Sequence, residues 1–95
     1  MPAYYIATPE QITDMDAMQE YAAHAPSVVD AFGGRYLVPR GVTHTLEGSW
    51  DPGFMVLIEF PTAERVLEFY ESEEYRPWRE LRQQAAKTSI VVTQS

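Results

Sequence analysis

The stretch FMVLIEF, Phe54–Phe60, is the most strongly strand-like segment of the chain. Successive side chains of a strand point to opposite faces of the sheet. One face then carries Phe54, Val56, Ile58 and Phe60, and the other carries Met55 and Leu57. A strand with one face in water alternates apolar and polar residues, whereas both faces are apolar here. The segment therefore predicts a sheet that is covered on both sides.

A split helix is expected directly after this strand. Pro61 ends the strand, and Thr62 can cap a helix that begins TAERVLEFY. Pro77 cannot lie inside an unbroken helix without a cost of about 3 kcal/mol. We therefore expect a break before Pro77, a restart near residues 73–76 and a second helical piece over 78–87.

The N-terminal third predicts a strand and a helix. Residues 3–8, AYYIAT, are a short β-branched and aromatic run that suits a first strand. A helix is expected to begin at a capping box at Thr13 and to end at Gly33. Pro26 lies within it, so we expect a kink or a fresh start there.

Three further segments complete the predicted sheet. GRYLVP from Gly34 and THTLEG from Thr43 are interpreted as short strands joined by a turn around Arg40 and Gly41. TSIVVTQ, residues 88–94, is the last strand. We assign the order βαββαβ with a split second helix. This order predicts an α+β, ferredoxin-like sandwich, in which helices cover one face of an antiparallel sheet.

The composition limits the classes of partner. Ninety-five residues make one domain, 1–95. Seven basic and fourteen acidic residues give a net charge of -7, which repels nucleic acid and anionic membrane surfaces. There is no cysteine, and no signal peptide or run of about 18 apolar residues is found. We expect a cytoplasmic protein.

The second apolar face of the strand Phe54–Phe60 predicts a homodimer. Leaving about three or four large apolar side chains in water forgoes about 1.5–3 kcal/mol each, against a domain stability of roughly 5–15 kcal/mol. The chain has no residues left for a second layer. We therefore expect two copies to pair sheet against sheet, as a dimeric α/β barrel.

Five motifs together resemble a known family. In chain order they are GGRYLV from Gly33, LEGSW from Leu46, IEFP from Ile58, Tyr70-x-Ser72-x-x-Tyr75, and Leu81 with Arg82. Over nearly the whole chain this pattern resembles the bacterial family of domain of unknown function 1330. The resemblance implies the dimeric α/β-barrel superfamily, whose members include cofactor-free quinone-forming monooxygenases, muconolactone isomerase and haem enzymes such as chlorite dismutase. It implies no particular reaction.

Arg82 is the sharpest candidate for a functional residue, because it shares an apolar helix face with Leu81 and Ala85. It is a candidate to hold a substrate carboxylate or enolate in a cleft between sheet and helices. The rings expected to flank it are those of Tyr70, Tyr75 and Trp78. The alternative is an internal ion pair with Glu59 or Glu47.

Three more residues are candidates for proton transfer or substrate binding. Glu59 is either a general base whose pKa is raised by burial or a structural partner of Arg35 or Arg82. Arg35 either reaches the mouth of the cleft or crosses its strand to an acid. His44 is either an acid or base near the hairpin or a half-exposed strand residue.

No metal or cofactor is expected. The two histidines, His24 and His44, have no second ligand at metal-binding spacing. Haem relatives need a proximal histidine on a helix, and His24 lies off the apolar stripe of its helix.

Two hypotheses of function follow. In the first, the protein orients a small acidic or phenolic molecule with Arg82, Tyr70 and Tyr75. If the protein is also a cofactor-free enzyme of isomerase or monooxygenase type, Glu59 or His44 moves a proton. In the second, it is a non-catalytic binding or stress-related module with no open cleft. A cavity of about 300 Å³ or more that Arg82 faces would favour the first hypothesis.

Overall fold

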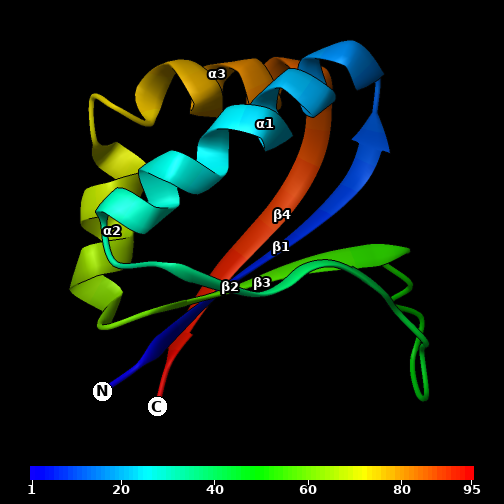
Figure 1. Ribbon diagram of the computed structural model, residues 1–95. Helices are drawn as coiled ribbons and strands as arrows, with labels where there is room; N and C mark the ends of the chain where they lie inside the picture. The colour runs from blue at the N-terminus through cyan, green and yellow to red at the C-terminus, as the bar shows by residue number, and fades with distance from the viewer.

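The computed structural model describes residues 1–95 as one antiparallel sheet with three helices on one of its faces (Figure 1). The elements are β1 (Ala3–Ile12), α1 (Met15–Ala31), β2 (Arg35–Val42), β3 (Phe54–Phe60), α2 (Ala63–Glu71), α3 (Arg76–Ala85) and β4 (Ala86–Gln94). The strand order is β2-β3-β1-β4. This is the ferredoxin-like α+β fold that the sequence predicts. No helix is long and apolar enough to cross a membrane.

The predicted break in the second helix is confirmed. α2 ends at Glu71 and α3 begins at Arg76, with Pro77 in the first turn, where a missing backbone N–H costs no helical hydrogen bond. Ser72 stabilises the corner between them, because its hydroxyl donates to the carbonyl of Phe69 and accepts from the amide of Tyr75. The split gives α3 a direction of its own, and α3 carries Arg82.

The first helix differs from the prediction in two respects. α1 is one continuous helix through Pro26, without a fresh start. Burial of Ala25 and Val29 on either side of the proline holds both parts on the same core. The capping residue is Asp14, which accepts from the amide of Ala17 at 3.1 Å, and not Thr13, whose hydroxyl donates to the end of α3.

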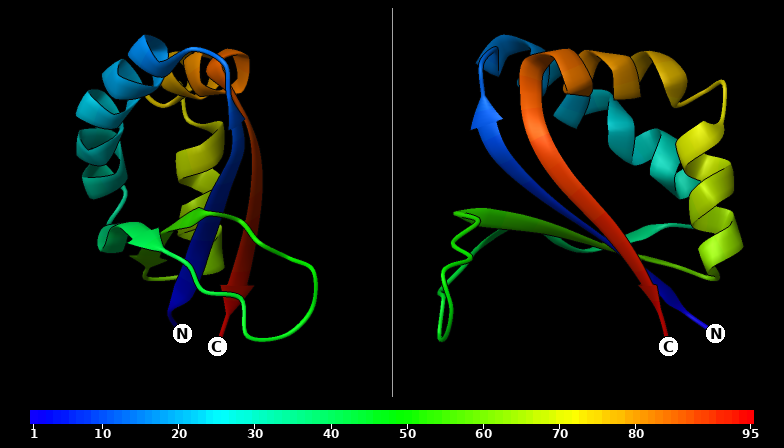
Figure 2. Two further views of the ribbon diagram at one scale, coloured as in Figure 1. Left: turned by 90° about the vertical axis from the view of Figure 1, so that its right-hand side faces the viewer. Right: turned by 180° about the vertical axis from the view of Figure 1, so that it is seen from behind.

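The predicted hairpin within residues 34–48 is wrong. β2 runs on through Arg40 and Gly41 and pairs directly with β3, from Arg35 opposite Glu59 to Val42 opposite Phe54. Residues 43–53 form a loop that projects from the end of the sheet (Figure 2). The alternating segment THTLEG pairs with no strand, and β2, its predicted partner, pairs with β3 instead.

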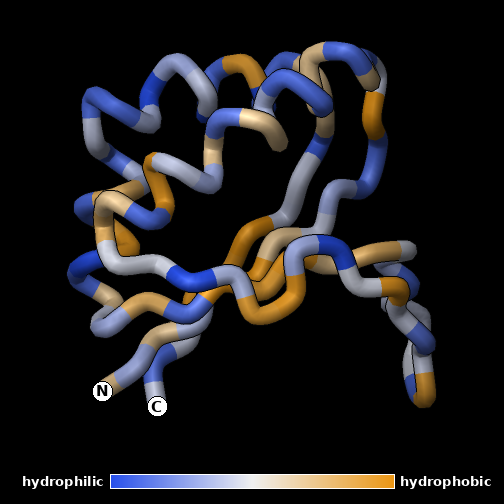
Figure 3. Tube along the Cα trace, in the orientation of Figure 1, coloured by the Kyte–Doolittle hydropathy of each residue, from blue (hydrophilic) through white to orange (hydrophobic).

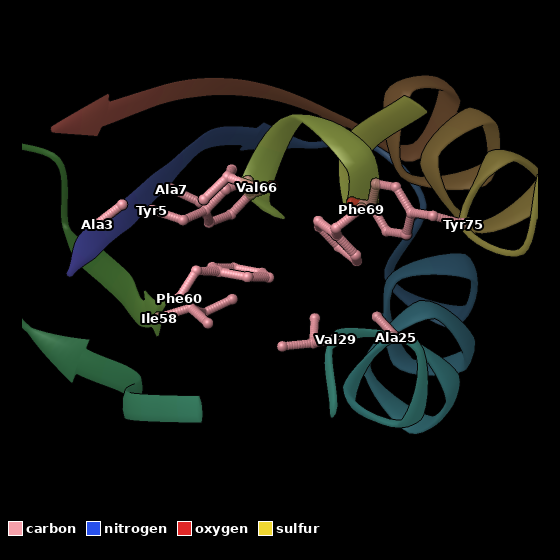
Figure 4. Close-up of a cluster of buried hydrophobic side chains, with 10 residues drawn as sticks. All are labelled: Ala3, Tyr5, Ala7, Ala25, Val29, Ile58, Phe60, Val66, Phe69 and Tyr75. Atoms are coloured by element: carbon pink, nitrogen blue, oxygen red, sulfur yellow. The ribbon is translucent and has the colours of Figure 1, made fainter. Parts of the chain in front are cut away.

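The buried core fills the end of the molecule nearest α2 (Figure 4). Phe69 lies at its centre, with its ring centroid 4.2 Å from Tyr75 and 5.5 Å from Phe60. The other members of this cluster are Ala3, Tyr5, Ala7, Ala25, Val29, Ile58 and Val66. The cluster brings the inner face of the sheet together with α1, α2 and Tyr75, the residue before α3, so the packing of aromatic rings holds this end closed.

The opposite face of the sheet carries no helix, as both views of Figure 2 show. We call it the outer face. Its apolar side chains stand at facing register positions, with Ile6 opposite both Leu57 and Val91, and the central strands are among the most hydrophobic parts of the chain (Figure 3). Val91 is 59% exposed. The apolar outer side of β3 therefore continues across the neighbouring strands β1 and β4.

Candidate functional site

A cavity of about 490 Å³ lies between the inner face of the sheet and α1, next to the aromatic core, with which it shares Tyr5, Ala7 and Ile58. This volume is within the range of about 300–1,000 Å³ for small-molecule sites. All four strands contribute to its walls, together with α1 and one residue of α3. Small residues line it where large ones would fill it, notably Ala7 and Ala22 on facing elements. The fold therefore leaves space that its own side chains do not occupy.

Arg82 is the residue of α3 that lines this cavity. Only 5% of it is exposed, and no carboxylate lies within 4.0 Å of its guanidinium. Its Nε and Nη2 atoms are buried and have no hydrogen-bond partner. The other arginines of the helix are occupied, since Arg76 pairs with glutamates and Arg79 donates to the carbonyl of Tyr70.

Phenol groups surround the guanidinium of Arg82. The hydroxyls of Tyr21 and Tyr75 share a hydrogen bond of 2.6 Å. Burial, with a smaller contribution from Tyr75, raises the pKa of Tyr5 and Tyr21 well above the usual value and that of Tyr36 to about 12. These phenols are therefore neutral at physiological pH, and they serve as hydrogen-bonding groups and not as anions.

The electrostatic state of Arg82 follows from the same neighbours. Burial lowers the pKa of its guanidinium, but the phenol oxygens of Tyr75 and Tyr5 beside it raise this pKa by more. Arg82 is thus a permanent positive charge at the wall of a cavity in which no side chain is negative.

Of the three aromatic residues predicted to flank Arg82, Tyr70 and Trp78 do not line the cavity. Tyr75 is fully buried and lies beside Arg82, whose pKa it raises, and its hydroxyl also contacts that of Tyr21. Tyr70 packs against Tyr75 with ring centroids 6.0 Å apart and does not line the cavity. Trp78 stacks on His24 of α1, with centroids 4.4 Å apart and planes within 5°. Trp78 and Tyr70 therefore support the helices around the site and do not form its wall.

Glu59 and Arg35 are not part of the cavity. They form an ion pair of 2.8 Å between β3 and β2, on the outer face. Glu59 is thus the structural partner of Arg35. The alternative prediction, an ion pair of Arg82 with Glu59 or Glu47, is wrong. The reason is the period of the strand: Glu59 points to the same side as Leu57, away from the helices.

His44 is also outside the cavity. It lies in the loop of residues 43–53 and lines a separate, open hollow with Glu47 and Trp50. It is not the strand residue that was expected, since β2 ends at Val42. The cavity beside Arg82 contains no carboxylate and no imidazole, and the structure groups no three His, Asp or Glu side chains for a metal ion.

Several cavity residues were not singled out from the sequence. They are Tyr5, Tyr21, Tyr36, Met18, Arg40 and Thr88. Alternation along β1 places Tyr5 with Ala3 and Ala7 on the inner face, which the sequence alone reveals. Tyr21 belongs to the apolar stripe of α1 and was interpreted only as core. Nothing in the sequence separates a core residue from a cavity wall.

A model of the family described as a domain of unknown function (DUF1330) matches residues 2–95. The chain belongs to the DUF1330 family. The match spans almost the whole domain, including β1 and β4 at its two ends. No curated protein matches this DUF1330 chain.

Solved structures share the fold of this DUF1330 protein at low sequence identity. The RPA0582 protein of Rhodopseudomonas palustris, of unknown function, is 16% identical with a TM-score of 0.78, over 99% of this chain and 82% of its own. A dimeric ferredoxin-like protein of unknown function from Jannaschia sp. CCS1 is 12% identical with a TM-score of 0.74, over 100% of both chains. SnoaB, a cofactor-independent oxygenase from Streptomyces nogalater, is 4% identical with a TM-score of 0.69, over 99% of this chain and 92% of its own. At these identities the likeness shows the fold alone.

Proposed function

We propose that this protein binds a small acidic or phenolic organic molecule in the cavity between sheet and helices, and that Arg82 holds the anionic group of that molecule. The observation that carries the proposal is the state of Arg82: 5% exposed, facing the cavity and without an acidic partner. A buried charge without a partner is costly, and proteins normally pair such charges internally. A ligand anion provides the missing partner.

The rest of the cavity suits the body of an organic molecule. Its walls are mainly apolar, with Met18 from the helical side and Val56 and Ile58 from the sheet. Binding sites of this kind combine apolar walls with a few polar groups that fix orientation. The size of the cavity also favours this hypothesis over a module with no open cleft.

A cofactor-free enzyme is the second candidate function. Its support is that a structure of the same fold, SnoaB, is described as a cofactor-independent oxygenase. A buried guanidinium stabilises negative charge that develops on a substrate oxygen, as in enolate chemistry. No carboxylate or imidazole lines the cavity, so a substrate of this enzyme would have to bind in its ionised form. We no longer assign the proton transfer to Glu59 or His44.

We also propose that the protein is a homodimer in which two outer faces meet. Ile6, Leu57 and Val91 stand side by side on this face, and no helix covers them. The similar structure from Jannaschia is described as dimeric. Apolar sheet faces of this kind are stabilised by packing against a second sheet.

A ligand screen on natively purified protein tests the proposed function. Native mass spectrometry would identify co-purified molecules, and thermal shift would rank aromatic and aliphatic acids. We expect acids to stabilise the parent protein and the Arg35→Leu control, but not Arg82→Leu. If stabilisation of Arg82→Leu equals that of the parent protein, Arg82 does not hold the ligand.

A further inference from the structure

The two unpartnered nitrogen atoms of Arg82 lie on one edge of its guanidinium. They are Nε and Nη2, and both are buried. Their N–H bonds project nearly parallel from the planar group, which is the fork that binds both oxygens of a carboxylate. A phenolate has a single oxygen, which two parallel donors can share only through bent and therefore weaker hydrogen bonds. The free edge therefore favours a carboxylate over a phenolate.

Thr88 supplies a second unpartnered polar group. Its Oγ1 atom is buried without a hydrogen-bond partner, and the residue lines the same cavity. α3 ends at Ala85 and β4 begins at Ala86, so Arg82 and Thr88 approach the cavity from either side of one junction. Buried hydroxyls in folded proteins are normally hydrogen-bonded, so an orphaned one at a cavity wall indicates a ligand contact.

The remaining walls favour a ligand with a single negative charge. Arg82 is the only buried basic residue that lines the cavity. Arg40 also lines it, but is exposed and lies over the ring of Phe54, with its Cζ atom 4.4 Å from the centroid. The net charge of -7 further disfavours dianions and polyphosphates.

From these three observations we propose that the ligand is a monocarboxylate with an apolar body. Its carboxylate lies side-on against the Nε–Nη2 edge of Arg82, and the hydroxyl of Thr88 forms a further hydrogen bond to the polar end of the ligand. This inference rests on the proposed function and narrows it from acids and phenols to carboxylates.

Three probes with one apolar body and different polar groups test the inference. They are naphthoate, naphthamide and naphthol with the same ring position substituted, titrated into the full-length protein by calorimetry at neutral pH. We expect naphthoate to bind at least about tenfold more tightly than the other two, because only its group is a charged, two-oxygen acceptor. Equal or tighter binding of naphthol would overturn the assignment to carboxylates.

Variants of the two residues test the geometry. Arg82→Lys keeps the charge but removes the fork, and we expect it to weaken naphthoate binding about tenfold. Thr88→Val removes only the hydroxyl at nearly constant shape, and we expect a loss of about three- to tenfold, restored in Thr88→Ser. Thr93→Val, on the outer-face side of the same strand, is the control and should change nothing.

The outcomes separate this inference from the proposed function. If Arg82→Leu abolishes naphthoate binding while Arg82→Lys and Thr88→Val leave it unchanged, Arg82 acts as a point charge. The side-on geometry and the role of Thr88 are then wrong, although the proposed function stands. If none of the three probes binds the parent protein, both the inference and the proposed function are contradicted.

Discussion

Arg35 and Arg82 belong to opposite faces of the same protein and are in opposite states. Arg35, on the outer face, is 72% exposed at its side chain and pairs with Glu59 at 2.8 Å. Arg82, on the helical side, is 5% exposed and has no acidic partner. An arginine in water needs no partner, whereas a buried one does. The exposed Arg35 thus has an ion pair that contributes little to stability. The buried Arg82 has none, although an unpaired buried charge costs much more free energy.

The comparison extends to the two faces themselves. The helical face is closed by aromatic rings at one end and hollow at the other, where Arg82 lies. The outer face is apolar but uncovered. Each face therefore has an unmet requirement, a charge without a counter-charge on one and an apolar surface without a covering layer on the other. A ligand anion meets the first requirement and a second copy meets the second.

Leu57→Glu should have the largest effect. It places a charge at the centre of the outer face, opposite Ile6. We expect the dimer to weaken by more than a hundredfold, about 3 kcal/mol, since an unpaired carboxylate would have to be buried in the interface. Sedimentation at micromolar concentration should then change from about twice the 10.8 kDa chain mass to that mass. Leu67→Glu, on the exposed side of α2, is the matched control. A dimer that survives Leu57→Glu would move the interface elsewhere.

Arg82→Leu should have the next largest effect, and on ligand binding rather than on folding. We expect carboxylate affinity to fall by about 1.5–3 kcal/mol, the usual contribution of hydrogen bonds to charged groups. The thermal midpoint of the ligand-free protein should hold or rise, because the change removes an unpaired buried charge. Calorimetry and thermal denaturation on the same sample measure both. A marked loss of stability without ligand would show that Arg82 is a structural residue.

The buried phenols should make the fold sensitive to alkaline pH. The pKa of Tyr5, Tyr21 and Tyr36 is raised above the unfolded value of 10.0, so the folded state holds these protons more tightly. The resulting stability is complete below pH 10 and is lost as the pH rises through the folded-state pKa values. Denaturant titrations on either side of pH 10 should show the fall, and phenolate absorbance should appear with unfolding. Early ionisation of all the tyrosines without unfolding would contradict this expectation.

Breaking the Arg35–Glu59 pair should have the smallest effect. The Arg35 end of the pair is 72% exposed, so we expect Glu59→Gln to change the free energy of unfolding by less than about 1 kcal/mol. Ligand binding should stay unchanged, because neither residue lines the cavity. Denaturant unfolding and calorimetry check the two parts. A loss of binding in Glu59→Gln would restore Glu59 as a candidate for the site.

The sequence predicts the fold well where local signals are strong. Pro77 sets the break between α2 and α3, and the alternation of β3 identifies its two faces. The strand assigned to THTLEG is wrong because an alternating pattern describes only a segment that can pair, and β2 pairs here with β3 instead. The fresh start expected near Pro26 is absent, because burial of Val29 keeps the helix on the same core beyond the proline.

The site was predicted in part. Arg82 could be found because a charge on an apolar helix face is visible in the helical period. Glu59 is two residues from Leu57 in β3, so both side chains point to the outer face. The alternation of the strand therefore already argued against Glu59 as a site residue. The cavity itself could not be predicted. Its existence depends on how far the rings of Phe60, Phe69 and Tyr75 fill the space under the helices, which is a property of three-dimensional packing.

The stacked rings of His24 and Trp78 give the protein an intrinsic optical signal. They join α1, which walls the cavity, to α3, which carries Arg82. The other indole, Trp50, lies in the exposed loop of residues 43–53. In a Trp50→Phe variant all indole emission would come from the contact between these two helices. Its intensity would then report, without any added label, whether the helices on either side of Arg82 remain together.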